Sequence, residues 1–283
     1  MNRYSYNLIE ALVGTALIAL VPVFVSLVEA NSVVIGIVRL SIGVAGLGLW
    51  FLFKKDKRLS LTLHQLGMVA LIGLLFGMHW LSYFLSIKLS NATIGAIGLS
   101  SYGIHLTLLS WLFLKERPAS LNVLAIVISL IGNGLVLMQF PVADNFGFGL
   151  LIGILSGFIY ACVPLLHKRS AQIPAQTRTL GQFVFGLIFF IMFIPQGNWG
   201  FSSGDWPYLI AMGVLCTLIG HALWVNASTI LPIQITSCIF YLGLPFTMLF
   251  DYLIIGKILD GMTLVGAALV LGANMLNVYT LRT

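Results

Sequence analysis

The sequence predicts an all-α integral membrane protein with ten transmembrane helices. Of its 283 residues, 59% are hydrophobic and only 8% are charged, whereas soluble domains carry about 25% charged residues. The apolar residues form ten runs, each near the roughly 20 residues that a bilayer-spanning helix needs. Most basic residues lie between these runs. This composition excludes a soluble enzyme, and the net charge of +6 indicates membrane topology, not a nucleic-acid partner.

Each run is expected to form one helix, because none shows the alternation of β-barrel strands. Glu10 interrupts the first run, which favours a mature helix over a signal peptide. The expected spans are 8–28, 32–53, 63–88, 91–114, 120–140, 147–167, 177–195, 206–226, 233–255 and 260–280.

The charged residues between the runs divide by side of the membrane, and Lys88 and Lys257 are the two basic residues that fall on the acidic side. Basic residues follow the second, fourth and sixth runs, and acidic residues follow the first, fifth, seventh and ninth. The basic set is Lys54, Lys55, Lys57, Arg58, Lys115, Arg117, Lys168, Arg169 and Arg178, and the acidic set is Glu29, Asp144, Asp205 and Asp260. Because basic loops stay in the cytoplasm, both termini, with Arg3 and Arg282, are predicted to be cytoplasmic.

The chain also predicts an internal repeat, with halves 1–141 and 142–283. A shift of 141 residues aligns Tyr83 with Trp224, and Val21-Pro22 resembles Val163-Pro164 at a shift of 142. Five helices per half is an odd number, so the second half enters the membrane upside down. Inverted repeats of this kind are typical of transporters, with the substrate site near the midplane. A stripe of small residues at Gly149, Gly153 and Gly157 predicts close helix packing.

Three stretches, 83–92, 109–117 and 131–134, resemble the EamA domain of the drug/metabolite transporter superfamily, and 254–257 repeats the pattern more faintly. Arg39 is similar to an arginine of that domain's second span. Lys257 departs from the pattern, since glutamate is common there. The resemblance implies two EamA domains in a ten-helix carrier of the bacterial inner membrane that exports amino acids or other metabolites. The aromatic amino acid exporters are the branch that it favours.

Three charged residues fall within or near the spans and are candidates for an ion pair or for ion coupling. Charges at membrane depth cost about 2.5–3.5 kcal/mol on insertion scales, so they usually have a function. Arg39 and Asp251 lie at similar depths and are predicted to pair, either for transport or only to fix helix register. Glu10 lies near the start of the first span, where an interfacial role is the alternative.

Aromatic and histidine residues form the candidate substrate site. The predicted binding residues are His79, Trp80, Tyr83, Tyr102, His105, Tyr160, His221, Trp224 and Tyr241. Aromatic rings supply flat apolar area with a polar tip. The alternatives are an interfacial aromatic belt and, for the histidines, neutral hydrogen-bonding partners.

Three prolines inside spans are candidate hinges, because proline removes a backbone hydrogen bond from a helix. These are Pro22, Pro164 and Pro245, and a static kink is the alternative. The three cysteines, Cys162, Cys216 and Cys238, are expected to be core residues. No metal site or cofactor is predicted.

Together these features predict a secondary transporter that exports amino acids or similar small metabolites by alternating access. The chain has no Walker A motif or catalytic triad, so it is not expected to be an enzyme. The alternative is a membrane enzyme or lipid-binding protein that acts on lipid-linked substrates. The expected partners are the small-molecule substrate and membrane lipid, and the chain is expected to be a monomer or a homodimer. Proton coupling stays open.

Overall fold

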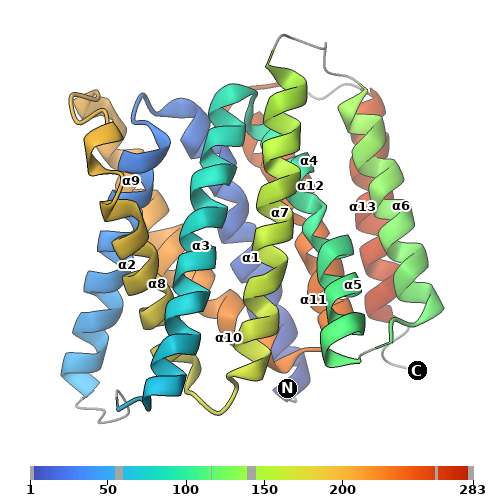
Figure 1. Cartoon of the computed structure of the whole chain (residues 1–283). Helices are drawn as coiled ribbons and strands as arrows, with labels where there is room; N and C mark the ends of the chain where they lie inside the picture. Colours follow the sequence, from blue (N-terminus) through green and yellow to red (C-terminus); the bar gives the residue numbers. More distant parts are fainter. Residues whose placement is uncertain (1–2, 55–59, 116, 139–144, 259–260, 280–283) are drawn as a thin grey trace.

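The helices stand side by side as one bundle in the computed structural model (Figure 1). The structure describes residues 3–54, 60–115, 117–138, 145–258 and 261–279. Within these ranges all regular secondary structure is helical. Several charged loop residues used for the topology prediction lie outside them, namely Lys55, Lys57, Arg58, Asp144, Asp260 and Arg282.

The described residues of the first half form six helical segments. They are α1 (Arg3–Leu27), α2 (Ser32–Lys54), α3 (Leu63–Leu89), α4 (Ala92–Ser100), α5 (Tyr102–Leu114) and α6 (Ser120–Leu137). Local side chains set where some of them begin. Thr62 and Gln65 form a reciprocal capping box at the start of α3, and the Asn91 side chain accepts from the Ile94 amide at the start of α4.

The second half contains α-helices together with 3₁₀ and π segments. They are α7 (Phe146–Arg169), α8 (Ala175–Ile191), the 3₁₀ turns η1 (Ile194–Gln196) and η2 (Ser203–Asp205), α9 (Trp206–Ala211), the π-helix η3 (Met212–His221), α10 (Ala222–Ile230), α11 (Ile233–Tyr241), α12 (Gly243–Phe250), the π-helix η4 (Asp251–Ile255) and α13 (Gly261–Tyr279).

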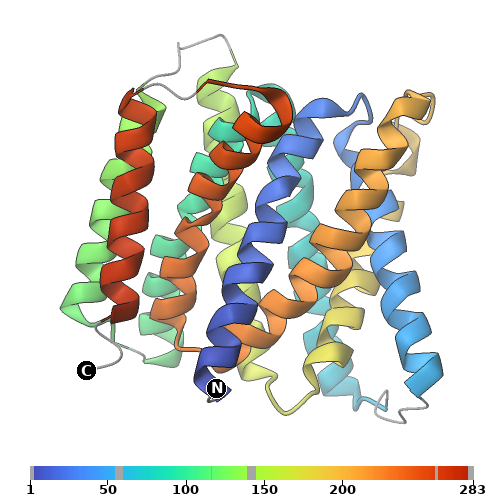
Figure 2. The ribbon, with the colours of Figure 1, turned by 180° about the vertical axis from the view of Figure 1, so that it is seen from behind.

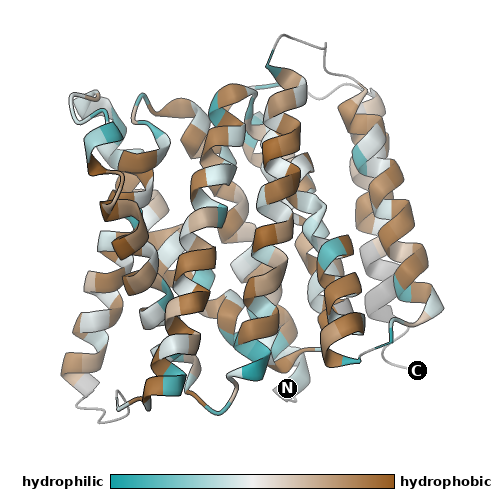
Figure 3. Cartoon of the chain, viewed as in Figure 1, coloured by the Kyte–Doolittle hydropathy of each residue, from teal (hydrophilic) through white to brown (hydrophobic). Residues whose placement is uncertain are grey.

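Among the described residues, eight helical stretches are long and apolar enough to cross a membrane. They correspond to eight of the ten predicted spans. The helix α8 has 17 residues, and the apolar part of α13, Leu264–Ala273, is shorter still. The seventh and tenth spans therefore stay predictions. The exterior is apolar, with Phe53 85% and Leu63 86% exposed, and hydrophilic residues gather mostly toward the helix ends (Figure 3).

The first helices of the two halves run in opposite directions through the bundle. The helix α1 begins at the same end of the bundle at which α13 ends, and we call this the N-terminal end (Figure 1). The view from behind agrees (Figure 2). The helices α1 and α7, each the first of its half, run in opposite directions.

Glycines permit the closest helix contacts, as the small-residue stripe predicts. A Cβ atom on Gly98 of α4 would lie 2.8 Å from the Cα atom of Gly153 on α7. A Cβ atom on Gly132 of α6 would lie 2.6 Å from the carbonyl oxygen of Gly266 on α13. Side chains at these positions would collide with backbone, which does not yield easily. The predicted close packing of the 149–157 stripe is confirmed.

Candidate functional site

A small cavity of about 10 Å³ lies in the interior of the bundle. It has about the space of one water molecule, and we call it the central chamber. Its walls come from both halves of the chain. The lining residues are Ile18, Val21, Arg39, His79, Trp80, Tyr83, Phe84, Leu99, Tyr160, His221 and Phe240.

Arg39 is the charged residue of the central chamber. It is fully buried, and its guanidinium carbon lies 3.9 Å from the centre of the Trp80 ring and 5.2 Å from that of Phe84. Its Nε donates to the hydroxyl oxygen of Thr217 over 3.1 Å. Nη1 and Nη2 have no hydrogen-bonding partner among the described residues. The cation is thus held by ring faces and one hydroxyl, with two donor nitrogens left over.

The π-helix η3 supplies the group that holds Arg39. The Thr217 hydroxyl donates to the carbonyl oxygen of Met212 over 3.0 Å, five residues back, which is the π-helical spacing. Its single hydrogen is therefore used within η3. Its oxygen is left to accept from Arg39, which fixes the orientation of the guanidinium group.

His79 is locked between two helices. Its Nδ1 lies 2.7 Å from the Ser156 hydroxyl oxygen, and that hydroxyl donates to the His79 carbonyl oxygen over 2.9 Å. Because the hydroxyl has one hydrogen, Nδ1 carries a hydrogen and donates it to the Ser156 hydroxyl oxygen. The His79 ring stacks on Tyr160 at 4.3 Å and on Tyr83 at 5.9 Å between ring centres.

Aromatic rings continue from His79 across the bundle. Phe240 of α11 lies 5.6 Å from Tyr160, 4.2 Å from Tyr102 and 5.5 Å from Trp224, measured between ring centres. His221 of η3 lies 5.5 Å from Trp80. Phe240 therefore joins the rings of the first half to those of the second.

Two helices are each interrupted by a single tight turn at equivalent positions beside the chamber, and the residue at each turn keeps right-handed helical dihedral angles. One break, at Ser101, separates α4 from α5, and the other, at Leu242, separates α11 from α12. These residues stand as far apart in the sequence as Tyr83 and Trp224. At both breaks the amide donates to the carbonyl oxygen three residues back, Gly98 for Ser101 and Ile239 for Leu242.

The two breaks have local causes. The Ser101 hydroxyl donates to the Gly98 carbonyl oxygen over 2.7 Å, and such bonds compete with the helical backbone. Pro245 follows the second break by three residues and has no amide hydrogen for the carbonyl of Tyr241. A second cavity of about 30 Å³ lies at the breaks and includes Ser100 and Gly243 in its lining. It shares Ile18, Tyr83, Leu99 and Phe240 with the central chamber.

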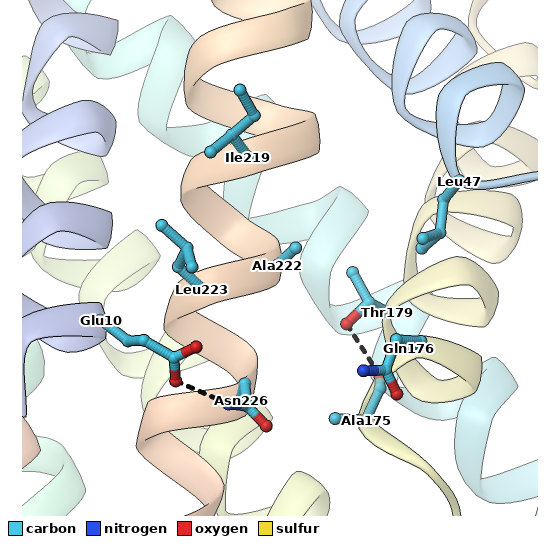
Figure 4. Close-up of a pocket in the computed structure, with 9 residues that line it drawn as sticks. All are labelled: Glu10, Leu47, Ala175, Gln176, Thr179, Ile219, Ala222, Leu223 and Asn226. Atoms are coloured by element: carbon cyan, nitrogen blue, oxygen red, sulfur yellow. Dashed lines mark hydrogen bonds between the residues drawn. The ribbon is translucent and has the colours of Figure 1, made fainter. Parts of the chain in front are cut away.

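A larger pocket of about 240 Å³ lies nearer the N-terminal end. Figure 4 shows its lining side chains, with Glu10 of α1 and Asn226 of α10 on one side and α8 on the other. The lining residues are Glu10, Leu47, Ala175, Gln176, Thr179, Ile219, Ala222, Leu223 and Asn226. Asn226 donates from Nδ2 to Glu10 over 2.6 Å. We call this the Glu10 pocket.

Hydrogen bonds tie the two halves together at the opposite end of the bundle. The Asp205 carboxylate accepts from the Ala30 amide over 2.8 Å. Asn198 accepts from the Asn31 amide over 2.7 Å and donates to the carbonyl oxygen of Glu29. The segment between α1 and α2 is therefore fastened to the segment between α8 and α9.

Comparison with known proteins identifies the family. A model described as the EamA-like transporter family matches twice, over residues 6–138 and 147–279. The chain belongs to the EamA-like transporter family. The resemblance that the sequence carries is thereby confirmed.

Relatives of this EamA-like transporter include bacterial proteins described as transporters. An "Uncharacterized transporter YxxF" of Bacillus subtilis (strain 168) is 24% identical over 182 residues, which span 63% of this chain and 58% of the relative. An "Uncharacterized transporter" of Clostridium kluyveri is 20% identical over 236 residues, 79% of this chain and 75% of the relative. A solved structure, "Crystal structure of protein", has the same fold, with a TM-score of 0.78, 19% identity and coverage of 99% and 97% of the two chains.

The structure of this EamA-like transporter does not bring Arg39 and Asp251 together, so the predicted ion pair is corrected. The Asp251 carboxylate lies 4.0 Å from Lys257 Nζ and 3.4 Å from the Thr93 hydroxyl. Arg39 lies at Trp80 and Thr217. Similar depth in the membrane does not fix the position around the bundle, and this is why the prediction failed.

The structure places other predicted residues at different distances from the chamber. His79, Trp80, Tyr83, Tyr160 and His221 line it. Two predicted rings, Tyr102 and Trp224, pack behind Phe240.

His105 and Tyr241 lie away from the chamber lining. The His105 ring contacts Phe158, whose side chain is 44% exposed. Tyr241 packs with Ile126 and Val270. The sequence had placed these two residues in the candidate site only as a histidine and an aromatic residue within the spans.

The predicted hinges differ in their surroundings. The helices α1 and α7 continue through Pro22 and Pro164, whereas Pro245 lies beside the break at Leu242. A hinge role for any of the three stays a prediction.

Several residues of the site were not predicted from the sequence, among them four with identifiable contacts. Phe240 lies at its centre, and Ser156, Thr217 and Asn226 hold His79, Arg39 and Glu10, respectively. The one available signal is the repeat. It aligns Leu99 with Phe240, and both line the chamber and the second cavity.

Proposed function

We propose that this protein is a secondary transporter that exports amino acids or similar small metabolites across the bacterial inner membrane. In this proposal two inverted five-helix repeats, 1–141 and 142–283, alternate access to the central chamber. Both termini are cytoplasmic, so the Glu10 pocket opens toward the cytoplasm.

The observation that carries the proposal is the pair of helix breaks at Ser101 and Leu242, beside a buried chamber that contains Arg39. Discontinuous helices at corresponding positions of two repeats are a pointer to the substrate site of a secondary transporter. The opposite directions of α1 and α7 support an inverted relation between the halves (Figure 1).

The two ends of the bundle support an inward-open arrangement. At the end away from the N-terminus, Asp205 and Asn198 fasten the halves together. At the N-terminal end lies the Glu10 pocket of about 240 Å³. Export then begins with entry through this pocket, followed by separation of the contacts at the other end.

Purified protein in proteoliposomes tests this function. Liposomes preloaded with a labelled amino acid and metabolite panel should release at least one compound faster than protein-free liposomes do. Phe240→Ala, which opens the ring contacts between the halves, should change that rate by about tenfold or more. Release at the protein-free rate for the whole panel would contradict the proposal. A pH gradient imposed in the same assay decides whether transport is coupled to protons.

A further inference from the structure

We infer that Arg39 binds the carboxylate of the transported substrate, and that the substrate is a monocarboxylate with an apolar or aromatic body. This inference rests on the proposed transport function. It assigns to the chamber a ligand class and a residue that recognises it.

The buried charge of Arg39 is the first observation that supports this inference. A fully buried cation within the membrane is costly unless an opposite charge compensates it. The carboxylates that the structure describes are engaged elsewhere or exposed. Asp205 accepts from Ala30, Glu10 accepts from Asn226, and Asp251 Oδ2 lies by Thr93 and Lys257. Asp251 Oδ1 has no partner among the described residues, but Asp251 is not among the residues that line the chamber, and Glu29 is exposed. A bound substrate is therefore the natural counter-charge.

The geometry of the Arg39 guanidinium group also favours a carboxylate. Nε of Arg39 already donates to Thr217, and the guanidinium group lies over the Trp80 ring. What is left is the edge with Nη1 and Nη2, neither of which has a partner among the described residues. Two parallel N–H donors match the two oxygens of a carboxylate. The group is held in place before the substrate arrives, so little entropy is lost on binding.

The side chains around the Nη1 and Nη2 edge of Arg39 indicate the class of substrate. His221 lines the same chamber, and its Nδ1 is also buried with no partner in the described part of the chain. The other walls are mostly rings and aliphatic side chains, including Tyr83, Tyr160 and Phe240. One cation beside an apolar wall fits a molecule with one carboxylate and an apolar body better than it fits a polyanion.

The space beside Arg39 must increase before such a molecule can bind. The chamber of about 10 Å³ is too small for such a molecule, and the adjoining cavity adds about 30 Å³. Ile18, Tyr83, Leu99 and Phe240 line both cavities. Leu99 and Phe240 each precede a helix break by two residues. Bending at the breaks would move these two side chains and join the cavities, which makes room beside Arg39.

Matched acids and amides test the inference by thermal shift on the detergent-purified full chain. The probes are L-phenylalanine against L-phenylalaninamide, L-leucine against L-leucinamide, and acetate against acetamide. We expect at least one amino acid to raise the apparent Tm more than its amide does, because ligands of the native state stabilise it. Acetate should stabilise less than that amino acid at equal concentration.

The variants separate the role of Arg39 from folding. Arg39→Gln should abolish the preference for acid over amide and weaken binding of the acid about 10- to 100-fold. Arg39→Lys keeps the charge without the two-pronged edge and should give an intermediate loss. Arg178→Gln is the control. Arg178 is also buried, but its nitrogens already donate to His167, Ile173 and Thr229, so its loss should lower Tm and leave the acid preference intact.

The outcomes are distinguishable. Equal stabilisation by acid and amide, no stabilisation by any carboxylate, or an unchanged preference in Arg39→Lys and Arg39→Gln would each overturn the inference. Acetate as effective as the amino acids would also overturn it, since Arg39 would then hold a structural counter-ion. The proposed function fails separately, if the proteoliposomes release none of the labelled panel, whether charged or neutral.

Discussion

Single residues of the chamber are held by partners that leave few alternative arrangements. His79 and Ser156 exchange two hydrogen bonds between α3 and α7, and Thr217 fixes Arg39 from η3. Such buried polar contacts have a large effect when one partner is removed, because the other keeps its desolvation cost without its bond. The site therefore combines donor groups in fixed orientations with a wall of rings.

The His79 contact gives the first prediction. Ser156→Ala removes the nearer acceptor of His79 Nδ1 and leaves only the Ser156 carbonyl oxygen at 3.3 Å. It should cost about 1–3 kcal/mol of stability, measured as a lower apparent Tm in detergent. Ser82→Ala is the matched control, because the Ser82 hydroxyl bonds to the carbonyl oxygens of Met78 and His79 on its own helix. An equal loss for the two variants would contradict the assigned role of Ser156.

The corrected ion pair gives the second prediction. Because Arg39 and Asp251 have different neighbours, the losses from Arg39→Gln and Asp251→Asn should add to within about 0.5 kcal/mol in the double variant. A thermal double-mutant cycle measures this. A coupling several times larger would restore the pair that the sequence had predicted.

At the scale of elements, the helix contacts follow from small residues, and these could be predicted from the sequence. The stripe at Gly149, Gly153 and Gly157 predicts a close approach, and Gly98 of α4 meets it. The break at Ser101 was not predicted, because hydropathy runs unbroken through it, and near Leu242 the sequence offered only Pro245 as a hinge or kink. The partners of the chamber residues were also missed, since periodicity places a residue on a face but does not identify the helix that it faces.

The contact between α4 and α7 gives the third prediction. Gly98→Ala places a Cβ atom against the backbone of Gly153 and should cost about 1–3 kcal/mol through overpacking. Gly134→Ala on α6 is the control, since a Cβ atom there meets nothing within 4 Å and alanine favours helix by about 1 kcal/mol. Apparent Tm values that fall equally in both variants would argue against the close contact.

The break between α11 and α12 gives the fourth prediction. Pro245→Ala supplies an amide hydrogen for the carbonyl of Tyr241 and should straighten the helix. We expect a more stable protein with slower turnover in proteoliposomes, whereas Pro164→Ala, within the continuous α7, should change turnover less. Faster turnover in Pro245→Ala would contradict a role for the break in transport.

At the scale of the whole molecule, the chain is an EamA-like transporter whose family model matches twice along its length. The Glu10 pocket lies toward the N-terminal end, and hydrogen bonds fasten the halves at the other end. The central chamber lies within the bundle and is lined by both halves. In our account, transport requires the fastened end to separate while the Glu10 pocket closes.

Reversible locking of the fastened end tests this claim most directly. The cysteines Cys162, Cys216 and Cys238 are replaced by alanine, and Asn31→Cys and Asn198→Cys are introduced where these residues meet. Release of a transported compound from proteoliposomes is then measured before oxidation, after oxidation and after reduction, with Asn31→Cys alone as the control. The account predicts that release stops in the cross-linked protein and returns on reduction. Unchanged release from fully cross-linked protein would contradict alternating access through this end.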